Sequence, residues 1–320
     1  MTQEKAVESV AAFLGINKPD AEKTLEKSIS AGELDSVENA ETWIEERLKP
    51  NTVFIDETGY SKMCIDALKI LKTTAATDYG SSRMRDLGQL WADMIRGYLG
   101  ELAFTHFLSK RVGLEIQLNH EKGDLKDFLP TDVHGIIDPE TKEIRQPRIR
   151  TSVKSTKLNG IWLDIPGAQF QHSDAYVLVK LGTGRDHLFA YFKSISVFRD
   201  KVLQKGRDQG LITETESEEI WNILPTFSTI PAYIVGFVLK DAPYKSLCYE
   251  GKKGKKHYTI TSWNGPIASG DLGRIKEIER VSGDVKFEGI GEFRHDSGYL
   301  FTTGKMRWKD ADWKELVSRI

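Results

Sequence analysis

The fold is decided by residues 83–118, which read RMRDLGQLWADMIRGYLGELAFTHFLSKRVGLEIQL. Through 83–111 the apolar side chains recur at helical spacing and form a broad face, which predicts a long and deeply buried helix. A β-like run at 114–118 follows directly, so we expect a helix packed against a sheet here. The apolar face holds Leu87, Leu90, Trp91, Met94, Ile95, Leu99, Leu102, Ala103 and Phe107.

Downstream of this segment the sequence predicts several closely spaced strands. The turn-forming residues Asp138-Pro139-Glu140 join the strands predicted at 131–137 and 148–156 as a hairpin. Residues 194–205 and 212–224 are expected to be helical, with glutamates in the first turns of the second helix. We therefore expect an α/β fold in which a mixed α+β sheet is flanked by helices. The predicted strands are 114–118, 131–137, 148–156, 175–181, 187–192 and 233–240.

The first 50 residues predict a small N-terminal helical module. Apolar residues at helical spacing indicate helices at 5–14, 20–29 and 38–48. Pro50 ends the last of them, because proline cannot continue a hydrogen-bonded helix. The module carries 11 acids and 6 bases, which does not suit DNA phosphates. We expect residues 1–50 to serve dimerisation or another accessory role, such as packing or partner binding.

The rest of the chain divides at about residue 240. Residues 51–240 are expected to form the core, which begins with a helix at 61–75. Residues 241–320 are richer in glycine and aromatic residues and predict a C-terminal α+β region that could recognise a ligand. Its expected strands are 257–262, 285–287 and 300–302, and its expected helices are 272–281 and 308–320.

Composition excludes several classes of protein. Hydrophobic residues make up 39% and charged residues 29%, which is typical of a globular chain. The sequence contains no apolar run near the ~18 residues of a membrane span and only two cysteines, so neither a disulfide framework nor a zinc site is expected. A cytoplasmic location fits best. Although the net charge is -2, residues 51–320 hold 39 bases and 36 acids, so a nucleic-acid partner is not excluded.

Three charged residues stand at positions where their types are uncommon. Glu101 lies inside the most apolar predicted helix, and buried acids are normally paired or bound to metal. Asp132 opens a predicted strand, and Lys154 lies in the next one on the same face as Ser152. Singly, each has an ordinary explanation: an acid paired with an arginine, a turn residue, and an exposed lysine of an edge strand.

Taken in chain order, these residues resemble the PD-(D/E)xK nuclease superfamily, which includes most type II restriction endonucleases. Pro130-Thr131-Asp132 stands where the family has Pro-Asp, stretched by one residue. Ser152-Val153-Lys154 stands where it has Asp/Glu-x-Lys. The resemblance covers about residues 85–200. It implies a restriction-endonuclease-like core that hydrolyses DNA phosphodiester bonds with Mg²⁺.

Ser152 departs from the family pattern, because a hydroxyl is a much weaker ligand for Mg²⁺ than a carboxylate. A group of restriction enzymes that cut sites with a CCGG centre is similar in having Ser-x-Lys and taking the missing acid from elsewhere in the chain. Glu101, Asp164 and Asp174 are the candidates here, with Glu101 first. If none reaches the metal, the protein binds DNA without cutting it.

The resemblance implies Glu101, Asp132, Ser152 and Lys154 as catalytic residues, with Mg²⁺ held by Asp132 and Glu101. Bound Mg²⁺ neutralises charge that develops on the phosphate and acidifies a water. The Lys154 ammonium would orient that water and stabilise the transition state.

Two further stretches are candidates for contact with DNA. Lys157 and Asn159 follow the lysine of the motif, although Asn159-Gly160 is equally typical of a hairpin turn. In a second, glycine-containing stretch four lysines attract phosphates, although a solvated loop is the usual outcome for such a run. Nearby Tyr258 and Trp263 could stack on bases. The four lysines are Lys252, Lys253, Lys255 and Lys256.

We therefore predict a site-specific DNA endonuclease similar to type II restriction enzymes, with residues 51–240 as its nuclease core and residues 241–320 as a candidate DNA-recognition part. Cutting both strands of a palindromic double-stranded site favours a homodimer with twofold symmetry. Two alternatives stay open: a nuclease directed to repair intermediates or modified bases, and a catalytically inactive nucleic-acid-binding protein.

Overall fold

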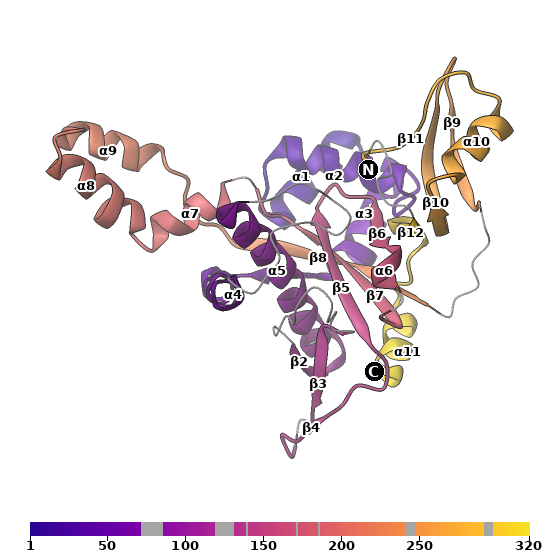
Figure 1. Cartoon of the computed structure of the whole chain (residues 1–320), viewed down its shortest axis with the longest axis horizontal. Coiled ribbons are helices and arrows are strands. Elements are labelled where there is room, and N and C mark those ends of the chain that lie inside the picture. Colours follow the sequence, from indigo (N-terminus) through magenta and orange to yellow (C-terminus); the bar gives the residue numbers. More distant parts are fainter. Residues whose placement is uncertain are drawn as a thin grey trace.

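The computed structural model describes residues 1–71, 86–118, 131–138, 140–170, 172–184, 186–240, 247–290 and 297–320. Within these ranges the protein is a mixed α/β structure in which helices cover a central sheet (Figure 1). The fold class predicted from the sequence is confirmed at this level. No described helix is long and apolar enough to cross a membrane.

Four strands form the central sheet in the order β1 (Thr52–Ile55), β8 (Ile230–Leu239), β7 (Ala175–Leu181) and β5 (Thr151–Lys157). β5 runs parallel to β7, whereas β8 is antiparallel to both β7 and β1. Every residue of β7 and β8 is buried, because helices cover both faces of the sheet. β5 lies at the end of this order.

Two helices, α4 (Glu57–Ile70) and α5 (Leu87–Val112), cover one face of the sheet. Asp86 caps the start of α5 by accepting a hydrogen bond from the Gln89 amide, and Gly113 ends it in the left-handed conformation. The predicted buried face is largely confirmed, but Leu87 at its start is exposed. The predicted helix at 61–75 overlaps α4, and its last residues lie outside the described residues.

The N-terminal helices cover the opposite face, and the three predicted helices are confirmed. Their apolar side chains form one core with Tyr176 and Leu178 of β7 and with Tyr233 and Val235 of β8. Residues 1–50 are therefore packed onto the sheet as a layer. The elements are α1 (Gln3–Leu14), α2 (Lys18–Ser30), η1 (Val37–Asn39), α3 (Ala40–Trp43) and η2 (Ile44–Leu48).

A buried ion pair joins this helical layer to the sheet. Lys180 of β7 donates to Glu33, and the two side chains are 1% and 0% exposed. The Tyr233 hydroxyl donates to the other Glu33 oxygen at 3.2 Å, and Arg47 donates to the Glu33 carbonyl at 3.2 Å. Burial raises the pKa of Glu33, but the charges of Lys180 and Arg47 outweigh it and lower the pKa overall, so the acid is ionised.

The strands after α5 form a separate antiparallel sheet in the order β2 (Glu115–Leu118), β3 (Val133–Ile137) and β4 (Ile144–Arg145). The turn at 138–140 joins β3 to β4, and the placement of Pro139 in it lies outside the described residues. The predicted hairpin from the strand of Asp132 to the strand of Lys154 is wrong, because β3 and β5 belong to different sheets. The sequence did not indicate β4, because two exposed residues carry no periodic signal.

A third sheet contains most of the C-terminal region. The long strand β10 pairs through its first half with β9 and β11, and through its second half with β12, which also pairs with β6. β6 comes from the core region of the sequence, so the predicted division at residue 240 does not separate the sheets. The elements are β6 (Trp162–Pro166), β9 (Tyr249–Lys253), β10 (Tyr258–Ala268), α10 (Asp271–Glu279), β11 (Val285–Phe287), β12 (Ser297–Thr302), η4 (Thr303–Lys305) and α11 (Asp310–Arg319).

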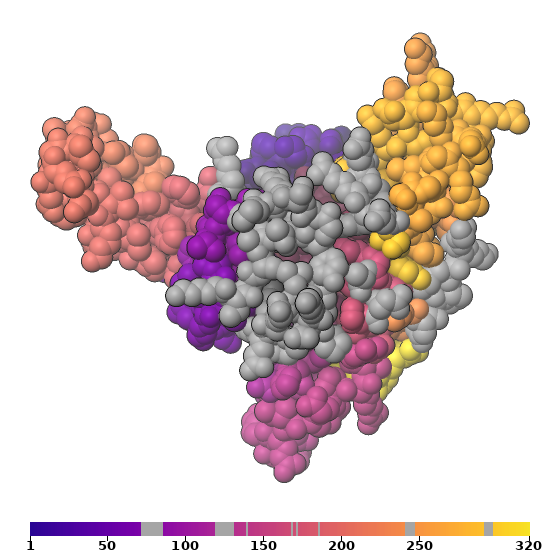
Figure 2. Space-filling model, in the orientation of Figure 1, coloured from indigo at the N-terminus to yellow at the C-terminus, as the bar shows by residue number. Residues whose placement is uncertain are grey.

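Residues 187–224 form a helical arm that projects away from the central sheet (Figures 1 and 2). The strand predicted at 187–192 is wrong, since these residues belong to a helix. A short apolar run is ambiguous between strand and helix, and Tyr191 here packs as a helical residue against the core. The arm consists of α7 (His187–Ser194), η3 (Phe198–Leu203), α8 (Gln204–Asp208) and α9 (Glu214–Ile223).

Candidate active site at the edge of strand β5

The strands that carry Asp132 and Lys154 meet at one point. The Asp132 amide donates to the Thr151 carbonyl at 2.9 Å, and the Thr151 amide donates to the Thr131 hydroxyl at 3.1 Å. Beyond this point β3 pairs with β2 and β4, whereas β5 pairs with β7. The two strands thus diverge from Asp132 onward, and within the described residues β5 pairs only with β7.

Asp132 lies one residue before β3 and points its carboxylate at β5. Its Oδ2 accepts hydrogen bonds from the Val153 amide at 2.6 Å and from the Ser152 hydroxyl at 3.1 Å. Both donors are neutral. Asp132 and Ser152, which the sequence analysis assigned to one site, are therefore in direct contact.

Lys154 is half-buried and lies on the same face of β5 as Ser152. Its ammonium donates to the side-chain carbonyl of Gln169 at 3.0 Å. Gln169 lies on α6 (Gly167–Phe170), in the connection between the parallel strands β5 and β7. Gln169 was not predicted from the sequence. The only feature that could have pointed to it is its position in the crossover between the parallel strands β5 and β7.

Glu101 is buried, with 7% of its surface exposed, on the helix that packs against β5. The approach is close at Gly100, where an added Cβ would lie 2.9 Å from the Cβ of Ser155, so glycine is needed there. The Ser155 hydroxyl donates to the Arg96 carbonyl at 3.1 Å, and this hydrogen bond joins β5 to α5 next to Gly100.

The three predicted residues approach from different directions. Val153 and Ser155 face α5, so Ser152 and Lys154 point to the opposite side of the strand. Glu101 comes from the α5 side, and Asp132 lies at the edge between the two sides. Any shared site must therefore extend around the edge of β5.

Tyr98 of α5 is within electrostatic reach of three carboxylates. Burial raises the pKa of this phenol, and the negative charges of Glu101, Asp66 and Asp132 raise it further. Asp66 on α4 was not singled out in the sequence, because it lies on a half-exposed helix.

The other two candidates for the missing acid have different surroundings. Asp174 accepts from Arg150 Nε at 3.1 Å and from Nη2 at 3.0 Å, so both of its oxygens are engaged by one guanidinium. Asp164 lies on β6, which belongs to the third sheet. Glu101 is the one on the helix packed against β5.

The donor set is compatible with Mg²⁺ but not with a cage made wholly of protein groups. Within the described ranges, no three His, Cys, Asp or Glu side chains gather closely enough to hold a metal ion. Mg²⁺ is commonly held through one or two carboxylates, with waters and substrate phosphates completing its shell. Asp132 and Glu101 would be those carboxylates.

The predicted DNA-binding residues lie on two separate surfaces. Lys157 is exposed at the end of β5, and Asn159 is exposed in the turn that follows. This turn is not a β-hairpin, because β5 and β6 belong to different sheets. Lys252 and Lys253 lie on β9, and Lys255 and Lys256 lie in the turn to β10; all four are exposed.

The stacking role suggested for two aromatic residues is wrong. Tyr258 is 6% exposed and Trp263 is 0% exposed, because both fill the core beneath β9, β10 and β11. Trp263 stacks on Tyr249 and meets Phe287 edge to face. Tyr258 and Trp263 therefore cannot stack on bases beside the four lysines of β9 and the β9–β10 turn.

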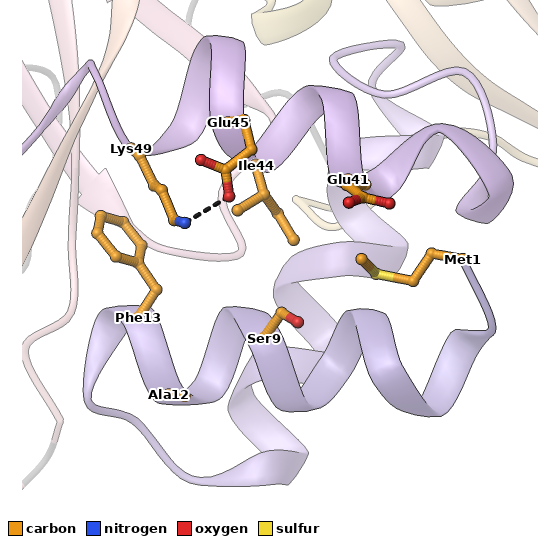
Figure 3. Close-up of a pocket in the computed structure, with 8 residues that line it drawn as sticks. All are labelled: Met1, Ser9, Ala12, Phe13, Glu41, Ile44, Glu45 and Lys49. Carbon is orange, nitrogen blue, oxygen red and sulfur yellow. Dashed lines mark hydrogen bonds and ion pairs between the residues drawn. The ribbon is translucent and has the colours of Figure 1, made fainter.

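A hollow of about 490 Å³ lies elsewhere, between α1 and the α3–η2 segment (Figure 3). Phe13 and Ile44 contribute apolar surface, and Lys49 pairs with Glu45 across its rim. The hollow contains none of the residues predicted for catalysis, so we do not assign the chemistry to it.

Comparisons with protein-family models, curated proteins and solved structures find no match to this chain.

Proposed function

We propose that this protein is a Mg²⁺-dependent DNA endonuclease with a restriction-endonuclease-like core, acting as a homodimer in the cytoplasm. One observation carries the proposal: Asp132 contacts Ser152 and Val153 of β5, Lys154 is the next residue of that strand, and the hydrogen bonds of both charges are with neutral groups. Asp132 accepts from a hydroxyl and an amide, and Lys154 donates to an amide carbonyl. An acid and a base left unneutralised by each other can serve a charged ligand.

The order of elements supports the resemblance to PD-(D/E)xK nucleases. A helix with a buried acid, α5, is followed by β2 and β3, then by β5 with its lysine, and then by a crossover to the parallel strand β7. This order agrees with the helix acid, strand acid and strand lysine on which the resemblance was based. Ser152, bonded to Asp132, remains the point of departure from the family pattern.

The residues would divide the chemistry as follows. Asp132 and Glu101 would hold Mg²⁺, which when bound neutralises negative charge on the scissile phosphate. Lys154 would hold a water in line for attack and stabilise the charge of the transition state, with Gln169 keeping the ammonium in place. Lys157 and Asn159 at the end of β5, and the lysines of the β9–β10 turn, would contact phosphates.

Cleavage of unmethylated plasmid DNA with Mg²⁺ tests the proposal. We expect discrete double-strand fragments from the wild-type protein and no cleavage by Asp132→Ala, while DNA binding measured with Ca²⁺ is retained. Glu143→Ala is the matched control, because Glu143 is an exposed acid near β4 and should leave cleavage unchanged. Wild-type cleavage by Asp132→Ala would refute the assignment of this site.

The alternative from another class is a catalytically inactive DNA-binding protein. The hydroxyl at Ser152 favours it, because the site has one carboxylate fewer than the family pattern. Tight DNA binding by the wild-type protein, with no hydrolysis in Mg²⁺ or Mn²⁺, would select this alternative. Cleavage of only modified or branched DNA would instead select a nuclease directed to such substrates.

A further inference from the structure

The helical arm exposes an unusual amount of apolar surface. Five of the twelve exposed large apolar side chains in the described residues lie within it. Single exposed apolar residues are common, but a concentration of them on one projecting element marks an interaction surface. The five are Phe189 (52% exposed), Ile195 (43%), Val202 (54%), Leu211 (72%) and Ile223 (81%).

The outer part of the arm has almost no core of its own. Within η3, α8 and α9 the buried side chains are Leu203 and Ser217. α8 has five residues and α9 has ten, and helices this short are marginal in water without tertiary packing. Polar contacts link them, such as the 2.6 Å hydrogen bond from Arg207 to Ser217, but these contribute little at a surface.

The two sides of the hairpin carry opposite charges, and part of these pair within the arm, where Arg199 contacts Glu218 and Arg207 contacts Glu214. Residues 198–208 carry four bases and two acids, whereas 214–223 carries four acids and no base. In a twofold contact each copy presents the same patch, so a base left over on one side of the hairpin can face an acid left over on the other side of the second copy. Lys205 and Glu219 are exposed and form no ion pair with any described residue, which leaves them available for this exchange.

We propose that η3, α8 and α9 pair with the same helices of a second copy of this chain, forming a four-helix bundle. Val202, Leu211 and Ile223 become buried between the copies, and Lys205 of each copy pairs with Glu219 of the other. The arm projects away from the central sheet, so the contact leaves the edge of β5 uncovered (Figure 1). This inference deepens the homodimer of the proposed function and names its surface.

Sedimentation velocity over a wide range of concentrations, without DNA or Mg²⁺, tests the inference. We expect a wild-type dimer and a monomer for Leu211→Glu/Ile223→Glu. The matched control is Ile65→Glu/Leu68→Glu, which places the same charges at two apolar residues of α4, each 53% exposed, and should remain dimeric. Circular dichroism checks that both double variants keep their helices.

A charge exchange gives an independent readout that does not depend on burying a new charge. Lys205→Glu should weaken the dimer, and Lys205→Glu/Glu219→Lys should restore it, because the exchange recreates the same pair with the signs reversed. If Lys205 or Glu219 had only a structural role within one copy, the double variant Lys205→Glu/Glu219→Lys would not restore the dimer.

Three results would overturn the inference: a wild-type monomer at every concentration, a dimer unaffected by Leu211→Glu/Ile223→Glu, or an equal loss of the dimer in the α4 control. A dimer that fails to cleave DNA would refute the nuclease and leave the arm contact standing. Cleavage of DNA by a wild-type protein that is a monomer would refute the arm contact and leave the nuclease standing.

Discussion

Two lysines lie on the same face of the central sheet and have opposite surroundings. Lys180 of β7 is fully buried and pairs with Glu33, whose other oxygen accepts from Tyr233. Lys154 of the neighbouring strand β5 is half-buried and donates to the neutral amide of Gln169. The first charge is neutralised within the fold, whereas the second is held in place but not neutralised.

Whether a charge is neutralised within the fold separates structural from functional charged residues in this protein. A buried ion is costly unless it is paired and hydrogen-bonded, and the Lys180 cluster meets that condition by joining the N-terminal helices to the sheet. At the edge of β5 the partners of Asp132 and Lys154 orient them without cancelling their charges. Substituting each lysine by the same residue should therefore have different consequences.

The largest effect is expected for Lys180→Met. The substitution leaves the Glu33 carboxylate buried without its ammonium partner, and breaking a buried pair typically costs about 3–5 kcal/mol. Urea unfolding at neutral pH measures the loss. The double variant Lys180→Met/Glu33→Gln should recover most of it, because no unpaired acid remains. A loss below about 1 kcal/mol in the single variant would show that Arg47 and Tyr233 suffice for Glu33.

Lys154→Met should reverse this pattern. The free energy of unfolding should change by less than about 1 kcal/mol, because the half-buried ammonium can be replaced by an apolar side chain without leaving a buried charge. Cleavage of plasmid DNA should fall about 10²–10³-fold, the loss typical of removing a group that stabilises the transition state. Lys142→Met, at an exposed lysine of the β3–β4 turn, is the control for both measurements. Unchanged cleavage would remove Lys154 from the site.

Much of the fold could be predicted from the sequence because its elements have strong periodic or capping signals. The limits of β7 and β11 agree with the predicted strands, and the capping box of Thr213 and Glu216 starts α9 where the glutamates indicated. The strand predicted at 187–192 is wrong. A continuous run of six apolar and aromatic residues fits the two-residue period of a strand and the 3.6-residue period of a helix equally well. Which neighbours such a run meets is decided by tertiary packing.

The candidate site was predictable in its types of residue but not in its geometry. The sequence pointed to Asp132 and Ser152, which are in contact, and to Glu101, which is buried. It could not indicate that Glu101 lies on the side of β5 packed by α5 while Lys154 points to the other side, since that depends on the packing of α5 at Gly100. Gln169 and the Lys180 cluster depend on contacts between distant segments, which no local pattern records.

The smallest predicted effect concerns Asp174, an acid that contrasts with Glu33 because its partner lies at the surface. The hydrogen bond from Arg150 lowers the pKa of Asp174, but the side chain is 38% exposed, so the pair is expected to contribute at most about 1 kcal/mol. Because the folded-state pKa lies below the unfolded value of about 3.9, the contribution is present above that pH and is lost as the pH falls through the folded-state pKa. Urea unfolding of Asp174→Asn and the wild-type protein should therefore differ at neutral pH and converge in acid. A difference that persists unchanged in acid would mean that Asp174 acts through its backbone-capping hydrogen bond to the Arg150 amide and not through its charge.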